Sequence, residues 1–267
     1  LFQRGEYARV EPFMLEHIAQ AEAAGDKHCV LSLLNELMGF YRSTSRFKDS
    51  LAAASKALGL MELMGLKGSV HYATTLLNVA TAYRADGQTA KAIEIFEEVG
   101  RLFTTLGVND VYLLASLSNN LSLAWQECGE HDKAIACLEQ ALPLIKVRPG
   151  SEVDVAVSLT NLSLSKIKLG RLAEASADLV NAVSLFESKP RISAHYSAAL
   201  AALGEIAYKE GKPQEAVAYY ERALRDTEAR YGKNMNYAIM LESLALVLED
   251  SDREKRLALK AEAQAIH

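Results

Sequence analysis

The chain has 267 residues, of which 50% are hydrophobic and 24% charged, so it carries enough apolar side chains for a large core. Its net charge of -5 gives no basic surface of the kind that phosphate backbones need, and we expect no nucleic-acid partner. Three cysteines make no disulfide framework, and no apolar stretch of about 18 residues predicts a membrane span; we therefore expect a cytoplasmic protein that contacts no membrane.

Apolar residues recur at helical spacing along almost the whole chain and predict thirteen helices. A lone helix over 6–24 comes first, introduced by Gly5, and it resembles the second helix of a pair that lacks its first helix. Six helix pairs follow, which we predict at 27–43 with 46–64, 67–86 with 88–106, 110–128 with 131–146, 151–169 with 171–188, 192–210 with 213–230, and 234–250 with 253–265.

A glycine marks the loop inside four of these pairs, at positions 87, 129, 170 and 211, and the steps are 42, 41 and 41 residues. An alanine follows each glycine five residues later, in the second helix, where a small side chain allows close helix packing. Self-similarity at this period predicts an all-α, right-handed α-solenoid of antiparallel helix pairs, helix A then helix B. We expect one domain over 1–267, within a longer protein, with a half repeat at 1–25 and repeats at 26–66, 67–108, 109–149, 150–190, 191–232 and 233–267.

Five positions depart from this pattern. Ser45 and Asp252 stand at the loop position where other units have glycine. Lys166 stands at a position of helix A that is aromatic in other units, and we expect a looser or more exposed site there. Pro143 and Pro12 fall inside predicted helices, so we expect bends, or a later start for the first helix.

The order of residues in the fifth full unit resembles the tetratricopeptide repeat. The run Leu203-Gly204-Glu205-Ile206-Ala207-Tyr208-Lys209-Glu210-Gly211 is continued by Ala216 and Tyr220. The long period is similar to the repeats of kinesin light chains, LGN/Pins adaptors and Rap-type bacterial regulators, and Ser118-Asn119-Asn120-Leu121 is similar to their Leu-Asn-Asn-Leu motif. This resemblance implies that helix A of each unit lines a concave groove, which holds peptides or partner helices.

Amide side chains recur on the predicted groove face. Asn78, Asn120 and Asn161 stand at steps of 42 and 41, and an amide can bind the backbone of a peptide whatever its side chains are. The alternative is that these amides bond a neighbouring helix or cap a turn. The residues that we predict to line the partner-binding groove are Asn35, Arg42, Asn78, Arg84, Asn119, Asn120, Gln126, Asn161, Glu205 and Tyr208.

Charges are unevenly distributed along this predicted face. Arg42 and Arg84 are 42 residues apart in the N-terminal half, whereas Glu205, Glu242 and Glu249 lie in the C-terminal half. The arrangement predicts a protein or peptide partner with an acidic or phosphorylated segment, held by the arginines. The alternative is that all these charges belong to solvated helix surfaces.

Sequence motifs for chemistry are missing. The chain has no glycine-rich phosphate loop, no His-Glu-x-x-His and no Gly-x-Ser-x-Gly, and its six histidines are scattered. We therefore expect no enzymatic activity, no metal and no cofactor. The favoured interpretation is a protein-interaction scaffold that binds a peptide or helix of its partner, and the alternative is a ligand- or peptide-sensing regulatory domain of a bacterial signalling or transcription regulator.

The lone N-terminal helix leaves one apolar face without its partner in the predicted array. We expect upstream residues, or another copy of the chain, to cover this face. An oligomer that forms through the N-terminal half repeat is therefore one of the predicted assemblies.

Overall fold

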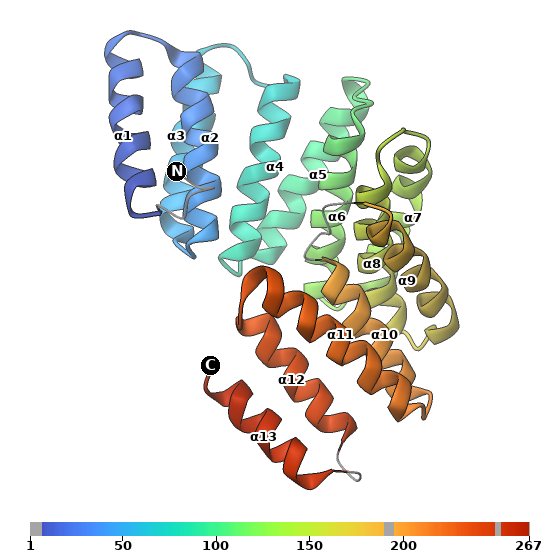
Figure 1. Ribbon diagram of the computed structural model, residues 1–267. Helices are drawn as coiled ribbons and strands as arrows, with labels where there is room; N and C mark the ends of the chain where they lie inside the picture. The colour runs from blue at the N-terminus through green and yellow to red at the C-terminus, as the bar shows by residue number, and fades with distance from the viewer. Residues whose placement is uncertain (1–6, 190–194, 249–251, 267) are drawn as a thin grey trace. The chain divides into compact units, whose positions relative to one another are not determined.

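A computed structural model describes residues 7–189, 195–248 and 252–266, which contain thirteen α-helices and no strand (Figure 1). They fall into an N-terminal unit, Leu1–Glu130, and a C-terminal unit, His131–His267. The first holds α1 (Tyr7–Ala23), α2 (Lys27–Ser43), α3 (Phe47–Leu63), α4 (Val70–Ala85), α5 (Thr89–Thr105) and α6 (Val111–Glu127). The second holds α7 (His131–Lys146), α8 (Glu152–Lys168), α9 (Leu172–Glu187), α10 (His195–Lys209), α11 (Pro213–Tyr231), α12 (Met235–Val247) and α13 (Arg253–Gln264).

These bounds confirm the predicted all-α solenoid of helix pairs, each helix beginning and ending within about three residues of its prediction. Gly5, which we predicted to introduce the first helix, lies outside the described residues. The boundary between the units follows Glu130, between the two helices that we predicted to form one repeat. A single domain over the whole chain therefore stays a prediction. Among the described residues, no helix is long and apolar enough to cross a membrane.

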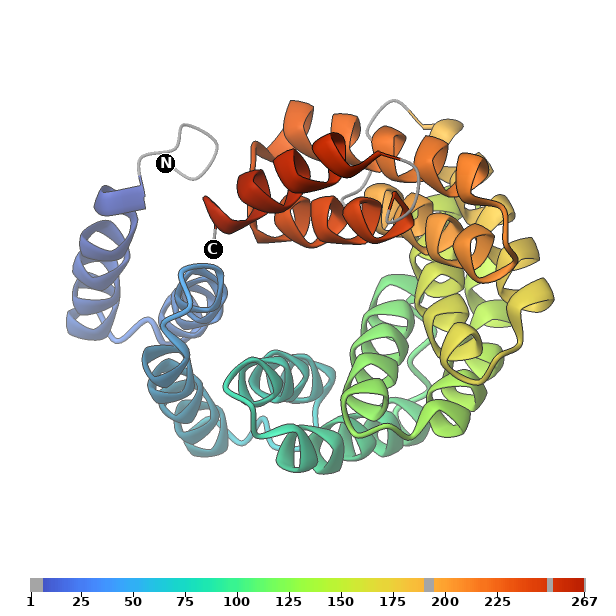
Figure 2. The ribbon, with the colours of Figure 1, turned by 90° about the horizontal axis from the view of Figure 1, so that it is seen from below.

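In the N-terminal unit, α2 pairs with α3 and α4 pairs with α5, while α6 packs on α5. The A helices α2, α4 and α6 also contact one another in order, and they form one layer, with α3 and α5 in the other (Figure 2). Side chains from both layers share one apolar core that includes Leu34, Phe96 and Phe103. Because each A helix is covered by a B helix on one side only, its other face remains free for polar residues.

The C-terminal unit repeats this arrangement. The pairs are α8 with α9, α10 with α11 and α12 with α13, and α7 packs on α8. Its A helices are α8, α10 and α12, of which α10 contacts both others. Leu179, Phe186 and Leu200 are fully buried between the layers.

The loop glycines have the backbone conformation that the repeat requires. Gly87, Gly129, Gly170 and Gly211 have φ angles of 78°, 76°, 74° and 74°. In the left-handed region a Cβ atom would meet the following carbonyl oxygen, so glycine is favoured at the end of each A helix. Ser45 stands at the same loop position with φ 57°. For a residue that has a Cβ atom, this left-handed conformation costs about 1–2 kcal/mol.

The prediction that Asp252 occupies the loop position was wrong. Helix α12 ends at Val247, and Asp252 has φ -153°. Its carboxylate accepts a hydrogen bond from the backbone N–H of Lys255 at 3.0 Å, so Asp252 caps α13 instead.

Lys166 is also in a different environment from the one predicted. The residue is only 6% exposed, and its Nζ lies 2.6 Å from Oδ2 of Asp178 on α9. The expectation of a loose or exposed site was wrong because the long apolar stem of lysine fills the aromatic position while a carboxylate from helix B neutralises its charge.

Small residues allow the helices of each pair to approach closely. The alanines that follow the loop glycines, Ala92, Ala134, Ala175 and Ala216, are all fully buried. In the fifth full unit Gly204 completes the contact, since a Cβ atom there would lie 2.9 Å from the Tyr220 ring. Larger side chains at these positions would push helix A away from helix B.

Pro12 and Pro143 both lie inside helices, α1 and α7. The alternative prediction of a later helix start at Pro12 was wrong, because α1 already begins at Tyr7. Pro12 is the sixth residue of α1, beyond the first four positions whose N–H groups lack an intrahelical acceptor, so it removes one hydrogen bond from the helix.

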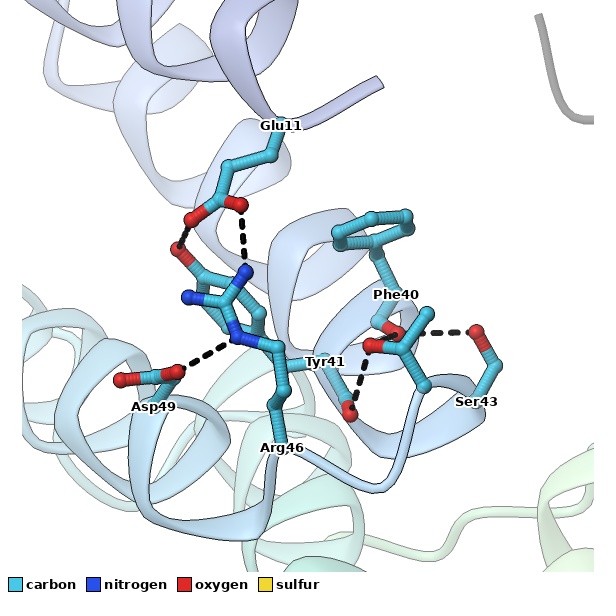
Figure 3. A network of polar contacts seen from close by, with 7 residues as sticks. Glu11, Phe40, Tyr41, Ser43, Arg46 and Asp49 are labelled. Atoms are coloured by element: carbon cyan, nitrogen blue, oxygen red, sulfur yellow. Dashed lines mark hydrogen bonds and ion pairs between the residues drawn. The ribbon is translucent and has the colours of Figure 1, made fainter. Parts of the chain in front are cut away.

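A polar network holds α1 on the first helix pair (Figure 3). The Glu11 carboxylate accepts hydrogen bonds from the Tyr41 hydroxyl, at 2.9 Å, and from the Arg46 guanidinium. Arg46 also bonds Asp49 at 2.7 Å and lies over the Tyr41 ring. The hydrogen bond from Arg46 lowers the pKa of Glu11, whereas burial and the contact with Glu11 raise the pKa of Tyr41 to about 12.

We predict that Gly204→Ala lowers the free energy of unfolding by about 1–3 kcal/mol, because the added methyl group overlaps the Tyr220 ring. Gly59→Ala in α3 is the matched control, since a Cβ atom there meets open space. Removal of a glycine from an open helix position should stabilise the protein by about 1 kcal/mol. Urea unfolding measures both; equal effects of the two substitutions would contradict the close contact.

We predict that Glu11→Gln lowers stability by about 1 kcal/mol at neutral pH, because the ion pair with Arg46 is lost. The folded state lowers the pKa of Glu11, so this contribution is present above the pKa of the unfolded carboxyl, about 4.3, and disappears as the pH falls through the folded pKa. Urea unfolding from pH 7 to pH 3 should show the two proteins converging at low pH. Glu16→Gln, on the same helix, is the control, and a gap that is constant with pH would refute the assignment.

Candidate functional site

The A helices of the N-terminal unit expose a polar surface, which we call the A-helix face. It consists of side chains on the side of α2, α4 and α6 that α3 and α5 leave uncovered. Every residue of this face is half-buried or exposed. They are Ser32, Asn35, Gly39 and Arg42 from α2, Thr74, Asn78, Thr81 and Arg84 from α4, and Ser116, Asn119, Asn120, Leu123 and Gln126 from α6.

Amide side chains join α2 to α4 across this face. Asn78 donates from Nδ2 to Oδ1 of Asn35 at 3.4 Å, and Asn35 donates to Leu31 O at 3.1 Å and to the Thr75 hydroxyl at 3.5 Å. These bonds favour the alternative that the amides hold neighbouring helices together. They also fix the two side chains in one orientation, which lowers the entropy that binding would cost.

The amides of α6 bond their own helix. Asn119 donates to Ala115 O at 2.9 Å, and Asn120 donates to Ser116 O at 2.8 Å. An amide has two N–H donors and a carbonyl acceptor, so one such bond leaves further capacity. Asn161, predicted as the next member of the row, is only 2% exposed in α8 and therefore does not belong to an accessible surface.

Arg84 is already paired within the protein. Its Nη1 lies 2.6 Å from Oε1 of Glu127 at the end of α6. The Thr89 hydroxyl donates to the second oxygen of the same carboxylate at 3.1 Å. Nε of Arg84 is buried and has no hydrogen-bond acceptor among the described residues. The Arg84 guanidinium is thus held in place by Glu127, with one donor left over.

Arg42 is half-buried and lacks such a carboxylate. Within the described ranges, its only hydrogen bond runs from Nη1 to the backbone O of Asn78, at 3.5 Å. Burial lowers the pKa of the Arg42 guanidinium, and the positive charge of Arg84 lowers it further. The environment therefore disfavours this charge, and an anion beside it would be stabilised.

A recess of about 390 Å³ lies at one end of the A-helix face. Its walls come from α2, the end of α3 and the start of α4, and they include His28, Ser32, Asn35, His71 and Thr74. Hydroxyl, imidazole and amide groups line it beside Leu31 and Met61, so it suits a polar group of a ligand.

The predicted residues of the C-terminal unit lie on its own A helices. Glu205 lies 3.1 Å from the Lys209 ammonium on α10, and Tyr208 is 39% exposed one turn further along. Glu242 is exposed on α12, while Glu249 lies outside the described residues.

The predicted groove residues did not include the apolar Ile239 and Leu246, which are 50% and 47% exposed on α12. They stand three residues before and four residues after the predicted Glu242, on the same face of the helix. This helical spacing was the signal that could have found them.

Over the ranges that the structure describes, no three His, Cys, Asp or Glu side chains are grouped so that they could hold a metal ion. Cys29, Cys128 and Cys137 form no disulfide within the described ranges, and burial raises the pKa of the Cys137 thiol to about 11. The side chains on the A-helix face can donate and accept hydrogen bonds and attract an anion, which are the functions of a binding surface.

Three stretches match models of the tetratricopeptide repeat, at residues 74–104, 114–146 and 197–228. These matches coincide with α4–α5, α6–α7 and α10–α11. A kinesin light chain-related protein of Arabidopsis thaliana, number 1 of its series, is 22% identical over 227 residues, 82% of this chain and 36% of the relative. The chain thus spans about a third of the length of the curated relatives that it matches.

Solved structures share the fold at low sequence identity. BtubC (BKLC) from P. vanneervenii is 19% identical, with a TM-score of 0.69 over 86% of this chain and 92% of that protein. The apo form of the quorum sensor NprR from B. thuringiensis is 15% identical, with a TM-score of 0.74 over 97% and 70%. NprR in complex with its cognate peptide NprX is also 15% identical and gives 0.67 over 99% and 78%.

We predict that the two arginines of the A-helix face differ in their effect on stability. Arg42→Gln should leave the free energy of unfolding unchanged or raise it by up to about 1 kcal/mol, because it removes a half-buried charge without a carboxylate. Arg84→Gln should lower it by about 1 kcal/mol, because Glu127 loses its partner. Urea unfolding of both variants tests this, and a larger loss for Arg42→Gln would mean that Arg42 has a structural role.

Proposed function

We propose, since the chain is a tetratricopeptide-repeat protein, that it is a non-enzymatic interaction scaffold, which binds a segment of a partner protein on the A-helix face of its N-terminal unit. The segment that we propose is acidic or phosphorylated and lies beside Arg42. Three cysteines without a disulfide among the described residues favour a reducing, cytoplasmic location for this interaction.

The single observation that carries the proposal is the state of Arg42. A guanidinium that is half-buried, bonded only to a carbonyl at 3.5 Å and close to a second positive charge is unfavourable in the free protein. A carboxylate or phosphate of the partner would accept charge-assisted hydrogen bonds from it and offset that cost. Binding would then be favoured, because it removes the cost of the half-buried Arg42 charge in the free protein.

Neighbouring groups support an extended segment of the partner. Asn120 uses one amide N–H within its own helix, and its carbonyl oxygen and second N–H have no partner among the described residues. These groups can bond a peptide backbone irrespective of its sequence. Gly39, one turn before Arg42, leaves open space in front of α2, so a bound chain can pass close to the helix.

Glu127 limits the affinity in this account. Its carboxylate occupies Arg84 and adds a negative charge to the same face. An acidic ligand would be repelled by Glu127 while it is attracted by Arg42. The internal carboxylate therefore favours ligands whose anion reaches Arg42 rather than Arg84.

A peptide-sensing regulatory domain is the second candidate. It is favoured by the likeness to NprR, a quorum sensor whose structure has been solved with its cognate peptide, over nearly the whole of this chain. Both candidates involve the binding of a peptide, and they differ in whether an output domain responds to it. Calorimetric titration with short peptides and with small metabolites separates peptide binding from the sensing of a small ligand.

The test uses peptides selected from a random library on the immobilised chain. We expect the selected sequences to contain Asp or Glu, and we expect Arg42→Gln to weaken their binding about tenfold or more. Gly39→Leu should also block binding, because its side chain fills the open space before α2. Gly59→Leu, at an equally open helix position of α3, is the matched control and should bind like the unaltered chain.

Glu127→Gln should change affinity in the opposite direction. It should increase affinity for the same acidic peptides several-fold, because it frees Arg84 from its ion pair. Selection of peptides without acidic residues, or equal affinity for the unaltered chain and Arg42→Gln, would refute the proposal.

A further inference from the structure

A second recess lies in the C-terminal unit, at the equivalent place in the repeat. The first is formed by α2, the end of α3 and the start of α4, and the second by α10, the end of α11 and α12. Ser32 and Asn35 precede the loop residue Ser45 by 13 and 10 positions, and Ala198 and Ala201 precede Gly211 by the same 13 and 10. Two alanines thus replace a serine and an asparagine, and the second recess is less polar.

The lining of this second recess, about 310 Å³ in volume, suits an apolar group. Ala198, Ala201, Tyr231, Ile239 and Met240 form much of its wall. Two polar groups of its lining are used within the fold, since the Ser197 hydroxyl donates to Asp226 at 2.8 Å and the Asn234 side chain caps α12. Thr227 and Asn236 also line the recess, and Thr227 is buried.

The apolar character continues beyond the recess. Tyr208 on α10 and Leu246 on α12 are 39% and 47% exposed, and Ile239 is 50% exposed. Helices α10 and α12 contact each other directly, so these side chains share one surface, which we call the α10–α12 face. Apolar surface on adjacent helices, next to a recess, is typical of a protein-binding site.

Two carboxylates divide this surface. Glu205 follows Ala201 by one turn of α10, and Glu242 follows Ile239 by one turn of α12. Tyr208 and Leu246 follow by about one more turn. Glu205 also pairs with Lys209, whose ammonium lies 3.1 Å from it. Two carboxylates and one ammonium still give this part of the face a net negative charge, so a basic side chain of a ligand would be attracted to it. The α10–α12 face therefore presents apolar, acidic and apolar positions in succession.

We propose that the α10–α12 face is a binding site of the C-terminal unit by itself, and that it takes a peptide segment with two apolar side chains and a lysine or arginine between them. The first apolar side chain enters the recess beside Ala201 and Ile239, the basic one lies beside Glu205 and Glu242, and the second packs on Tyr208 and Leu246. This inference rests on the proposed peptide-binding function, and it adds the chemical class of a segment that the C-terminal unit would bind.

The experiment measures peptides from the same library selection on the full chain, with variants on the α10–α12 face. Ile239→Gln removes apolar surface at a half-exposed position, and Ala201→Leu fills the recess. Each should weaken binding about tenfold for peptides that contain the apolar–basic–apolar pattern. Leu257→Gln on α13, where the leucine is 54% exposed, is the matched control and should leave affinity unchanged.

The outcomes separate this inference from the proposed function. If Arg42→Gln weakens the binding of acidic peptides but no selected peptide responds to Ile239→Gln or Ala201→Leu, the proposed function stands and this inference is overturned. If peptides with the apolar–basic–apolar pattern respond to the α10–α12 variants but no peptide responds to Arg42→Gln, this inference stands and the proposed role of Arg42 is overturned. Light scattering that finds a dimer, which Ile239→Gln converts to a monomer, would show that a second copy occupies the face and would also overturn the inference.

Discussion

The structure depends on the close approach of helix A and helix B in every pair. That approach requires a side chain no larger than a methyl group at the crossing, and Ala92, Ala134, Ala175 and Ala216 supply it while remaining fully buried. Gly204 extends the contact on the facing helix, against the Tyr220 ring. Because the pairs are held from within, the exposed sides of the A helices are free to carry residues chosen for binding. The same type of repeat can therefore carry a polar face, on α2, α4 and α6, or a more apolar face, on α10 and α12.

The parts of the fold that repeat locally could be predicted from the sequence. Left-handed glycines and buried alanines recur every 41 or 42 residues, and their position fixes where each A helix ends. Contacts between helices were harder to predict, since the burial of Lys166 depends on Asp178 in the following helix. Ile239 was missed because an apolar residue in a helix is expected in the core, although it is 50% exposed on the same face as the predicted Glu242. The arginines were found by their spacing, but the pairing of Arg84 with Glu127 joins two repeats and leaves no local signal.

The difference between the two arginines links stability to function in this account. Arg84 contributes to the fold through Glu127, whereas Arg42 is kept in an environment that disfavours its charge. Residues that are unfavourable for stability are commonly retained where binding needs them. The ordered amides of Asn35 and Asn78 hold α2 and α4 in a fixed relation, so the surface around Arg42 is organised before a ligand arrives.

The most direct test of the central claim is a crystal structure of the chain with an acidic peptide selected from the random library. The account predicts that a carboxylate of the peptide lies within hydrogen-bonding distance, about 3 Å, of the Arg42 guanidinium, and that the Arg84–Glu127 pair is retained. A peptide bound with its acidic groups in solvent, or on the B helices instead of the A-helix face, would contradict it.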